Sequence, residues 1–255
     1  MVTEGLDEVT AYAAEVGTRL DSITRLASEG GLDQAVTILA ECIERGGVIH
    51  AFGTGHSEAF AMEIAGRAGG LIPTNRIALR DVVLRGSREV DILGGSSLER
   101  DPAIVDELFE LTPVGEHDVF LIASNSGVNG SIVGMALKAK ETGHKVIAVT
   151  SLQHTDAVEP KHPSGKKLRD IADVVIDNKA PYGDATLELP GGVKAGAISS
   201  ITAAFIAQLL TLAVAERIAE SGQTPPVYIS ANIPGGDEHN KALEDLYRDR
   251  ISRTA

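Results

Sequence analysis

The chain has 255 residues, of which 43% are hydrophobic, a formal net charge of −13 at pH 7 and a single cysteine. This length and hydrophobic fraction suffice for a large α/β core. The acidic charge argues against partners such as nucleic acid or an anionic membrane surface, which select basic proteins. Because Cys42 has no second cysteine to pair with, an internal disulfide and a cysteine-based zinc site are both excluded.

The first ten residues, MVTEGLDEVT, lack the basic start and apolar centre of a secretory signal peptide. No uninterrupted apolar stretch approaches the roughly 18 residues that a membrane-spanning helix needs. We therefore expect a cytoplasmic protein.

Hydrophobic periodicity predicts two opening helices, over residues 6–27 and 32–43, each followed by a pair of glycines. A strand is expected at 48–52, then a polar turn with a helix that ends before Gly69, and a further strand within 71–79. Residues 81–100 mix short apolar runs with Gly and Ser, which is typical of a long active-site loop.

The second half of the chain continues the alternation of helices and strands. Asp101 as the capping residue and Pro102 in the first helical position predict a helix over 103–111. Strands are expected at 119–123, 145–150, 174–177 and 186–189, helices at 128–142, 197–219 and 237–251, and a polar loop at 154–167. The helix over 197–219 is almost entirely small or apolar, which predicts burial in the fold or at a subunit interface.

Strands that alternate with helices predict an α/β fold, a three-layer α/β/α sandwich with a parallel sheet of about five strands. We expect one domain over 1–255, with a helical pair over about 1–46 and a terminal helix over about 237–253. One face of a sheet cannot cover the apolar surface of the opening helices and of 197–219. We therefore predict a homodimer or a higher homo-oligomer, with binding sites close to the subunit interface.

Two Gly/Ser loops of the same design, roughly 70 residues apart, carry most of the information about function. They lie within VIHAFGTGHSEAFAMEIAG (48–66) and DVFLIASNSGVNGSIVGMALKA (118–139). Each sequence consists of a short apolar strand, a polar turn and the start of a helix. The first N–H groups of a helix have no intrahelical partner and carry the positive end of its dipole, so this arrangement favours a bound phosphate.

The candidate phosphate-binding and substrate-binding residues are Gly53, Thr54, Gly55, His56 and Ser57 in the first loop and Ser124, Asn125, Ser126, Gly127 and Asn129 in the second. A dinucleotide fingerprint is excluded because Glu58 stands where its third glycine belongs, and no GxxxxGK[ST] motif is present. The simpler interpretation of the first loop is a tight turn in which Ser57 caps the helix.

The motifs GTGHS and SNSGVN, each after a predicted parallel strand, resemble the two loops of the sugar isomerase (SIS) domain. The segments RAGGLIP (67–73), DNKAPYGDATLEL (177–189) and ISANIPGGDEHN (229–240) are similar to a narrower bacterial group, the UPF0309 SIS proteins. The resemblance extends along most of the chain. It implies the flavodoxin-like SIS fold, a phosphorylated sugar as ligand, and no metal or organic cofactor.

In the isomerases of this family, a carboxylate moves a proton between C1 and C2 of the open-chain sugar. The phosphoheptose isomerases place a glutamate ten residues after the serine of the first loop, where this chain has Arg67. Glu63, six residues after Ser57, is the nearest substitute, and Glu99 is a second candidate. A histidine, sometimes from a neighbouring subunit, assists ring opening in these enzymes, and His239 in GGDEHN matches that role.

Each catalytic candidate has a simpler interpretation. Glu63 has the i,i+4 spacing of a helical ion pair with Arg67. Glu99 is then a solvated loop residue and His239 an exposed helix residue, and His154 and His162 in the predicted polar loop are interpreted as surface residues. A metal site at 237–239 is rejected because adjacent helical residues point in different directions.

The expected function is isomerisation of a phosphorylated sugar or amino sugar through an enediol. The alternative is a sensor that binds a sugar phosphate without turnover and acts on a protein partner. The acidic first segment argues against a DNA-binding regulator.

Overall fold

A parallel five-stranded sheet lies at the centre of the computed structural model, which describes residues 4–252. The strand order is β2-β1-β3-β4-β5. The bounds are β1 Ile49–Gly53, β2 Thr74–Ile77, β3 Val119–Ala123, β4 Lys145–Thr150 and β5 Val174–Asp177. Both β1 and β3 are buried along their whole length, as expected for a parallel sheet covered on both faces.

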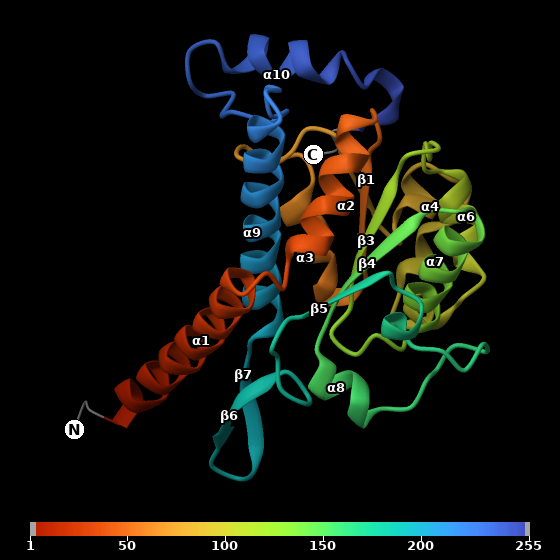
Figure 1. Ribbon diagram of the computed structural model, residues 1–255. Coiled ribbons are helices and arrows are strands. Elements are labelled where there is room, and N and C mark those ends of the chain that lie inside the picture. The colour runs from red at the N-terminus through yellow and green to blue at the C-terminus, as the bar shows by residue number, and fades with distance from the viewer. Residues whose placement is uncertain (1–3, 253–255) are drawn as a thin grey trace.

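Helices cover both faces of the sheet and form a separate hydrophobic core on each side (Figure 1). One face carries α1 Glu4–Ser28, α2 Asp33–Glu44, α3 Glu58–Ile64 and α9 Ser199–Glu220. The other carries α4 Asp81–Leu84, α5 Ser97–Arg100, α6 Ile104–Glu110 and α7 Gly130–Glu141. Successive strand residues enter opposite cores, as Leu121 and Ile122 of β3 do. The predicted α/β/α sandwich is confirmed.

The helix α9 is long and apolar enough to cross a membrane by length and composition, although Ser, Thr and Gln interrupt its apolar residues. In the structure it packs against α1, α2 and α3. Nine of its residues are buried, among them Ile206, Leu210 and Val214, which belong to the core of that face. We interpret α9 as a core helix, because a core helix meets the same criteria of length and composition.

Two segments predicted as loops contain short helices. Residues 81–100 form α4, the 3-10 turn η2 Val90–Leu93 and α5, because Val82 and Leu98 are drawn into the core beside α6 and α7. The segment after β4 begins with α8 Leu152–Ala157, and the 3-10 turn η3 Leu168–Asp170 precedes β5. In this second segment the residues between α8 and η3 are irregular.

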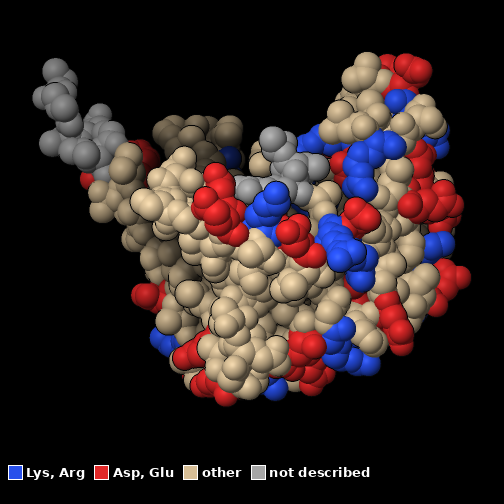
Figure 2. Space-filling model, turned by 90° about the horizontal axis from the view of Figure 1, so that it is seen from above, with Lys and Arg blue, Asp and Glu red and all other residues tan. Residues whose placement is uncertain are grey.

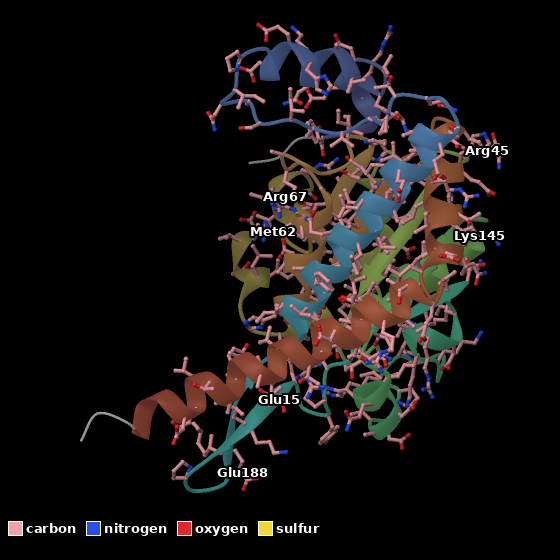
Figure 3. The ribbon with its side chains drawn as sticks, turned by 60° about the vertical axis from the view of Figure 1, so that its left-hand side comes forward. Glu15, Arg45, Met62, Arg67, Lys145 and Glu188 are labelled. Carbon is pink, nitrogen blue, oxygen red and sulfur yellow. The ribbon has the colours of Figure 1, made fainter. Side chains whose placement is uncertain are left out.

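The strand predicted at 186–189 lies outside the main sheet. It belongs to β6 Ala185–Leu189, which pairs in antiparallel fashion with β7 Val193–Ala197. Gly191 and Gly192 connect the strands with φ of 91° and 77°, the left-handed backbone that a tight hairpin turn requires. The hairpin and the first half of α1 extend together from the domain, joined by a hydrogen bond from Tyr12 Oη to Ala197 O of 2.6 Å (Figures 1 and 3).

The terminal helix is shorter than predicted. α10 Gly236–Glu244 starts after Gly235, whose φ is 78°, and is followed by a turn and the 3-10 segment η4 Arg248–Arg250. The helix ends early because the chain turns to bring Arg250 Nη2 within 2.6 Å of Asp118 Oδ1, just before β3. This segment lies over the amino ends of the strands, where acidic and basic side chains intermingle on the surface (Figures 1 and 2).

Candidate functional site

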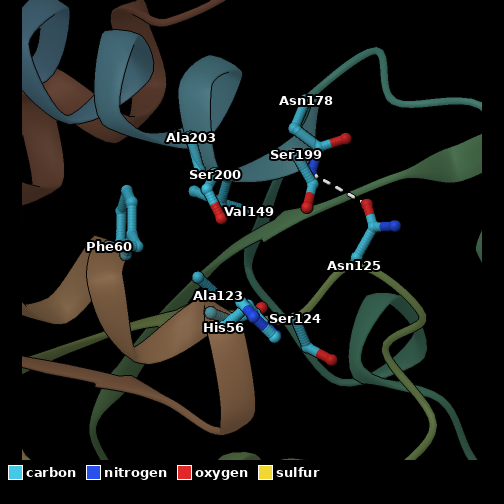
Figure 4. A pocket seen from close by; sticks show the side chains of 11 residues that line it. His56, Phe60, Ala123, Ser124, Asn125, Val149, Asn178, Ser199, Ser200 and Ala203 are labelled. Atoms are coloured by element: carbon cyan, nitrogen blue, oxygen red, sulfur yellow. Dashed lines mark hydrogen bonds between the residues drawn. The ribbon is translucent and has the colours of Figure 1, made fainter. Parts of the chain in front are cut away.

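The two Gly/Ser loops lie side by side at the carboxyl ends of β1 and β3, which are neighbours in the sheet. β1 stands between β2 and β3, so the direction of winding reverses at this point, where open α/β sheets bind their ligands. A pocket opens here between α3, the second loop and the start of α9 (Figure 4). Its lining residues are His56, Ser57, Phe60, Ala123, Ser124, Asn125, Val149, Asn178, Ser199, Ser200 and Ala203.

The first loop turns tightly from β1 into α3. A Cβ on Gly53 would stand 2.2 Å from the backbone oxygen of Ser57, so only glycine fits, and Gly55 has a φ of 56°. Thr54 between them is extended and buried. Ser57 is the residue before α3, but its side chain makes no capping hydrogen bond among the described residues. Its hydroxyl is therefore available to a ligand in the pocket.

The second loop forms a concave row of hydrogen-bond donors. Gly127 adopts a φ of 65° and donates its N–H to Ser124 Oγ at 3.1 Å. Within the described part of the chain, the backbone N–H groups of Asn125, Ser126 and Asn129 donate to no other residue. Such a row at the start of a helix, here α7, is suited to hold an anion.

Glu99 lies between the two loops rather than on a solvated surface. Its Oε1 is 3.1 Å from the position that a Cβ on Gly55 would occupy, and its Oε2 accepts from Asn129 Nδ2 at 3.4 Å. The backbone of α5 is docked on the start of α7, because Ser131 Oγ donates to Glu99 O at 2.8 Å. A carboxylate thus faces the region where both loops present their donors.

Glu63 does not line the pocket. Its carboxylate is ion-paired with Arg67 and accepts from Gln208 Nε2 at 2.6 Å, so the pair suggested by the i,i+4 spacing is present. Arg67 follows the end of α3, and its side chain is 47% exposed (Figure 3).

His239 lies on α10, at the amino ends of the strands, whereas the two loops and α8 lie at the carboxyl ends. Its Nε2 is 3.0 Å from Val227 O. Within one chain it does not line the pocket. A contribution from a second copy stays a prediction.

Three polar pocket residues escaped the sequence analysis: Asn178 after β5, and Ser199 and Ser200 at the start of α9. Asn178 Nδ2 donates to Asn125 Oδ1 at 3.2 Å (Figure 4). Asp184 accepts from both the N–H and the hydroxyl of Ser199, at 2.7 and 2.8 Å, and so caps α9. For Ser199 and Ser200, the signal in the sequence was two polar residues at the start of the most apolar helix.

His154, predicted to be a surface residue, is also part of the site's surroundings. Its Nδ1 is 3.4 Å from Asn125 Nδ2, and its ring packs against Tyr182 with 5.3 Å between centroids. Burial lowers the pKa of His154, with the charge of Lys161 acting in the same direction and Asp184 opposing it. The imidazole is therefore neutral at pH 7 and accepts a hydrogen bond from the Asn125 amide.

The match to a known family covers both loops. Residues 11–151 match the model of the SIS domain. "UPF0309 protein lmo0025" of Listeria monocytogenes is 40% identical over 223 residues, 86% of this chain and 89% of that protein. "UPF0309 protein BH3325" of Halalkalibacterium halodurans is 35% identical over 230 residues, 90% of this chain and 93% of that protein.

Two solved structures share the fold. The phosphoheptose isomerase of Francisella tularensis aligns with a TM-score of 0.56 at 19% identity, over 83% of this chain and 98% of that one. The protein c3406 of E. coli CFT073, solved in complex with a phosphosugar, aligns with a TM-score of 0.55 at 16% identity, over 86% and 94%.

Proposed function

Because this chain belongs to the UPF0309 family of SIS-domain proteins, we propose that it binds a phosphorylated sugar and interconverts its aldose and ketose forms. The observation that carries the proposal is the Glu99 carboxylate, which faces two loops built to hold an anion. The proposal is consistent with the shared fold of a phosphoheptose isomerase and of a protein solved with a bound phosphosugar.

The second loop is the proposed phosphate anchor. The N–H groups at Ser126 and Asn129 and the hydroxyls of Ser124 and Ser126 surround the anion, with Ser57 contributing from the first loop. Holding the phosphate fixes the open sugar chain relative to the carboxylate. This lowers the entropic part of the barrier to proton transfer.

Glu99 is the proposed base. Its carboxylate takes the proton from C2 of the open-chain aldose, and the electron pair of that C–H bond forms the C1=C2 double bond while O1 takes the negative charge. The proton of the C2 hydroxyl then passes to O1, C2 becomes the carbonyl carbon, and C1 takes back the proton held by the carboxylate. Asn129 donates to the same carboxylate and orients it. This chemistry needs no metal or organic cofactor.

Ring opening by His239 requires a second copy of the chain, because within one chain that residue lies at the other end of the sheet. We propose a homodimer formed through the outer face of α9 and α3. There Leu212 is 65% exposed, Met62 52% and Ile201 38%. Light scattering at micromolar concentration tests the proposed homodimer. A dimeric mass for the wild type and a monomeric mass for Leu212→Glu support it. A monomeric mass for the wild type contradicts it.

The test of function is a screen of pentose, hexose and heptose phosphates, with aldose and ketose resolved by NMR. Glu99→Gln is expected to reduce kcat by about 10²–10⁴, the range for a lost general base, with the affinity for phosphate retained. The matched control is Glu89→Gln, an exposed glutamate of the same segment that touches neither loop. Tight binding with no turnover by the wild type would instead indicate the sensor function.

A further inference from the structure

The carbonyl groups of the second loop are turned away from the pocket and held by hydroxyls of the chain that follows β4. Thr155 Oγ1 donates to Ser126 O at 2.9 Å. Thr150 Oγ1 lies 3.3 Å from Asn125 O, which also accepts the N–H of Ser151 at 3.2 Å. Both threonines are fully buried, and their hydroxyl oxygens are 3.0 Å apart.

Residues 150–155, which carry these hydroxyls, are themselves held by hydrogen bonds to the rest of the domain. Ser151 Oγ accepts the N–H of His154 at 3.0 Å and donates to Ala180 O at 2.6 Å. Lys167 Nζ donates to Thr155 O at 2.6 Å. Burying a hydroxyl costs free energy unless it is hydrogen-bonded. The contacts with the carbonyls of the second loop satisfy the hydroxyls of both threonines.

The geometry of the peptide unit links these contacts to the site. A planar trans peptide directs its C=O and its N–H to opposite sides. Fixing Asn125 O therefore turns the N–H of Ser126 away from β4, and fixing Ser126 O turns the N–H of Gly127 onto Ser124 Oγ. Because Ser124 Oγ accepts from Gly127, its own O–H remains to donate to an anion.

We propose that Thr155 and Thr150 are positioning residues of the anion site, which act through the carbonyls of Ser126 and Asn125. They hold the second loop in its binding shape before the ligand arrives, so that no loop ordering opposes binding. This inference rests on the proposed function for the identity of the ligand, while the arrangement of the loop is independent of it.

The variants are Thr155→Val, which removes the hydroxyl and keeps the branched shape, and Thr155→Ser, which keeps the hydroxyl. The matched control is Thr112→Val. That hydroxyl is also buried and also donates to a backbone oxygen, Leu108 O at 2.7 Å, but it lies between α6 and the amino end of β3. Affinity for inorganic phosphate is measured by calorimetry, and exchange of the Gly127 amide hydrogen is measured in the ligand-free protein.

Thr155→Val is expected to weaken phosphate binding about tenfold and to accelerate Gly127 amide exchange by a similar factor, the effect of one lost hydrogen bond. Thr155→Ser is expected to stay within about twofold of wild type, and Thr112→Val to lower Tm without changing either readout. Unchanged exchange in folded Thr155→Val, or a serine variant as weak as the valine one, would overturn the proposal.

If Thr155→Val does not fold, Thr150→Val carries the same test, with exchange read at Ser151, whose N–H donates to the same carbonyl, Asn125 O. Should the wild-type protein bind neither inorganic phosphate nor any sugar phosphate, the proposed function fails. The amide exchange of the ligand-free variants then still decides whether the threonines position the loop.

Discussion

The two ends of the parallel sheet treat polar groups in opposite ways. At the carboxyl ends of β1 and β3, the N–H groups of Asn125, Ser126 and Asn129 donate to no partner among the described residues, and Ser57 and Ser124 line a pocket. At the amino ends, the Asp118 carboxylate is fully buried and accepts four hydrogen bonds, from Val48 N, Gly115 N, His50 Nε2 and Arg250 Nη2, at 2.6–2.8 Å.

We call the amino ends of the strands, around Asp118, the closed end of the fold, and the carboxyl ends of β1 and β3, with the two loops, the proposed binding end. A buried charge is tolerated only when donors surround it, and Asp118 is saturated by its own chain. Burial of Asp118 acts to raise its pKa, but the hydrogen bonds from His50, Gly115 and Val48 outweigh it and the pKa is lowered. The second loop presents donors without such an acceptor, which is the arrangement expected where the acceptor is a ligand.

The largest effect is expected from breaking the closed end. Asp118→Ala leaves four donors around an empty position and should lower the free energy of unfolding by about 3–5 kcal/mol, the range for a broken buried pair. Urea denaturation measures it. The control is Asp106→Ala, whose carboxylate is 71% exposed and pairs with Lys138, with an expected loss below about 1 kcal/mol. Equal losses of stability for the two variants would contradict a larger contribution from the buried Asp118 carboxylate than from the exposed Asp106 carboxylate.

Acid should weaken the same network without a mutation. The folded-state pKa of Asp118 is lowered, so its contribution to stability is complete above the ordinary aspartate pKa of about 3.9 and is lost as the pH falls through the lower folded value. The stability difference between wild type and Asp118→Asn should therefore shrink below about pH 4. A difference that stays constant from pH 7 to pH 3 argues against an ionised Asp118 in the fold.

At the binding end, Ser126→Ala should weaken the binding of a sugar phosphate by about 1.5–3 kcal/mol, the range for a hydrogen bond to a charged group, with little change in stability. Calorimetry measures the affinity, and Ser164→Ala in an exposed loop is the control. Unchanged affinity in the double variant Ser124→Ala with Ser126→Ala would show that the second loop does not bind the phosphate.

The smallest effect is expected at Glu63. Glu63→Gln interrupts an ion pair with Arg67 on the partly exposed surface of α3, so stability should change by a few tenths of a kcal/mol and turnover should stay as in the wild type. The measurement is the same kinetic assay used for Glu99→Gln. A fall in kcat of a hundredfold or more would move the proposed base from Glu99 to Glu63.

The sequence by itself determined the sandwich and the position of both Gly/Ser loops. A buried strand has an apolar run, a helix has its own period, and the Gly and Ser between them mark the turn, so these features depend on residues that are close in the chain. The periodicity predicted β1, β3, α7 and α9 within a few residues, and Ser57, Ser124 and Asn125 line the observed pocket.

Only the tertiary structure decided which carboxylate lies beside the two loops. Glu99 lies next to Gly55 and Asn129 because Leu98 is buried against core residues distant in the sequence, and no periodic pattern shows how α5 docks on α7. Asn178 meets Asn125 across 53 residues of chain because β3 and β5, which these residues follow, lie on either side of β4 in the sheet. The terminal segment lies at the opposite end of the sheet because contacts such as that of Arg250 with Asp118, 132 residues apart, hold it there. These pairings depend on long-range packing, whereas the strands, helices and turns are encoded locally.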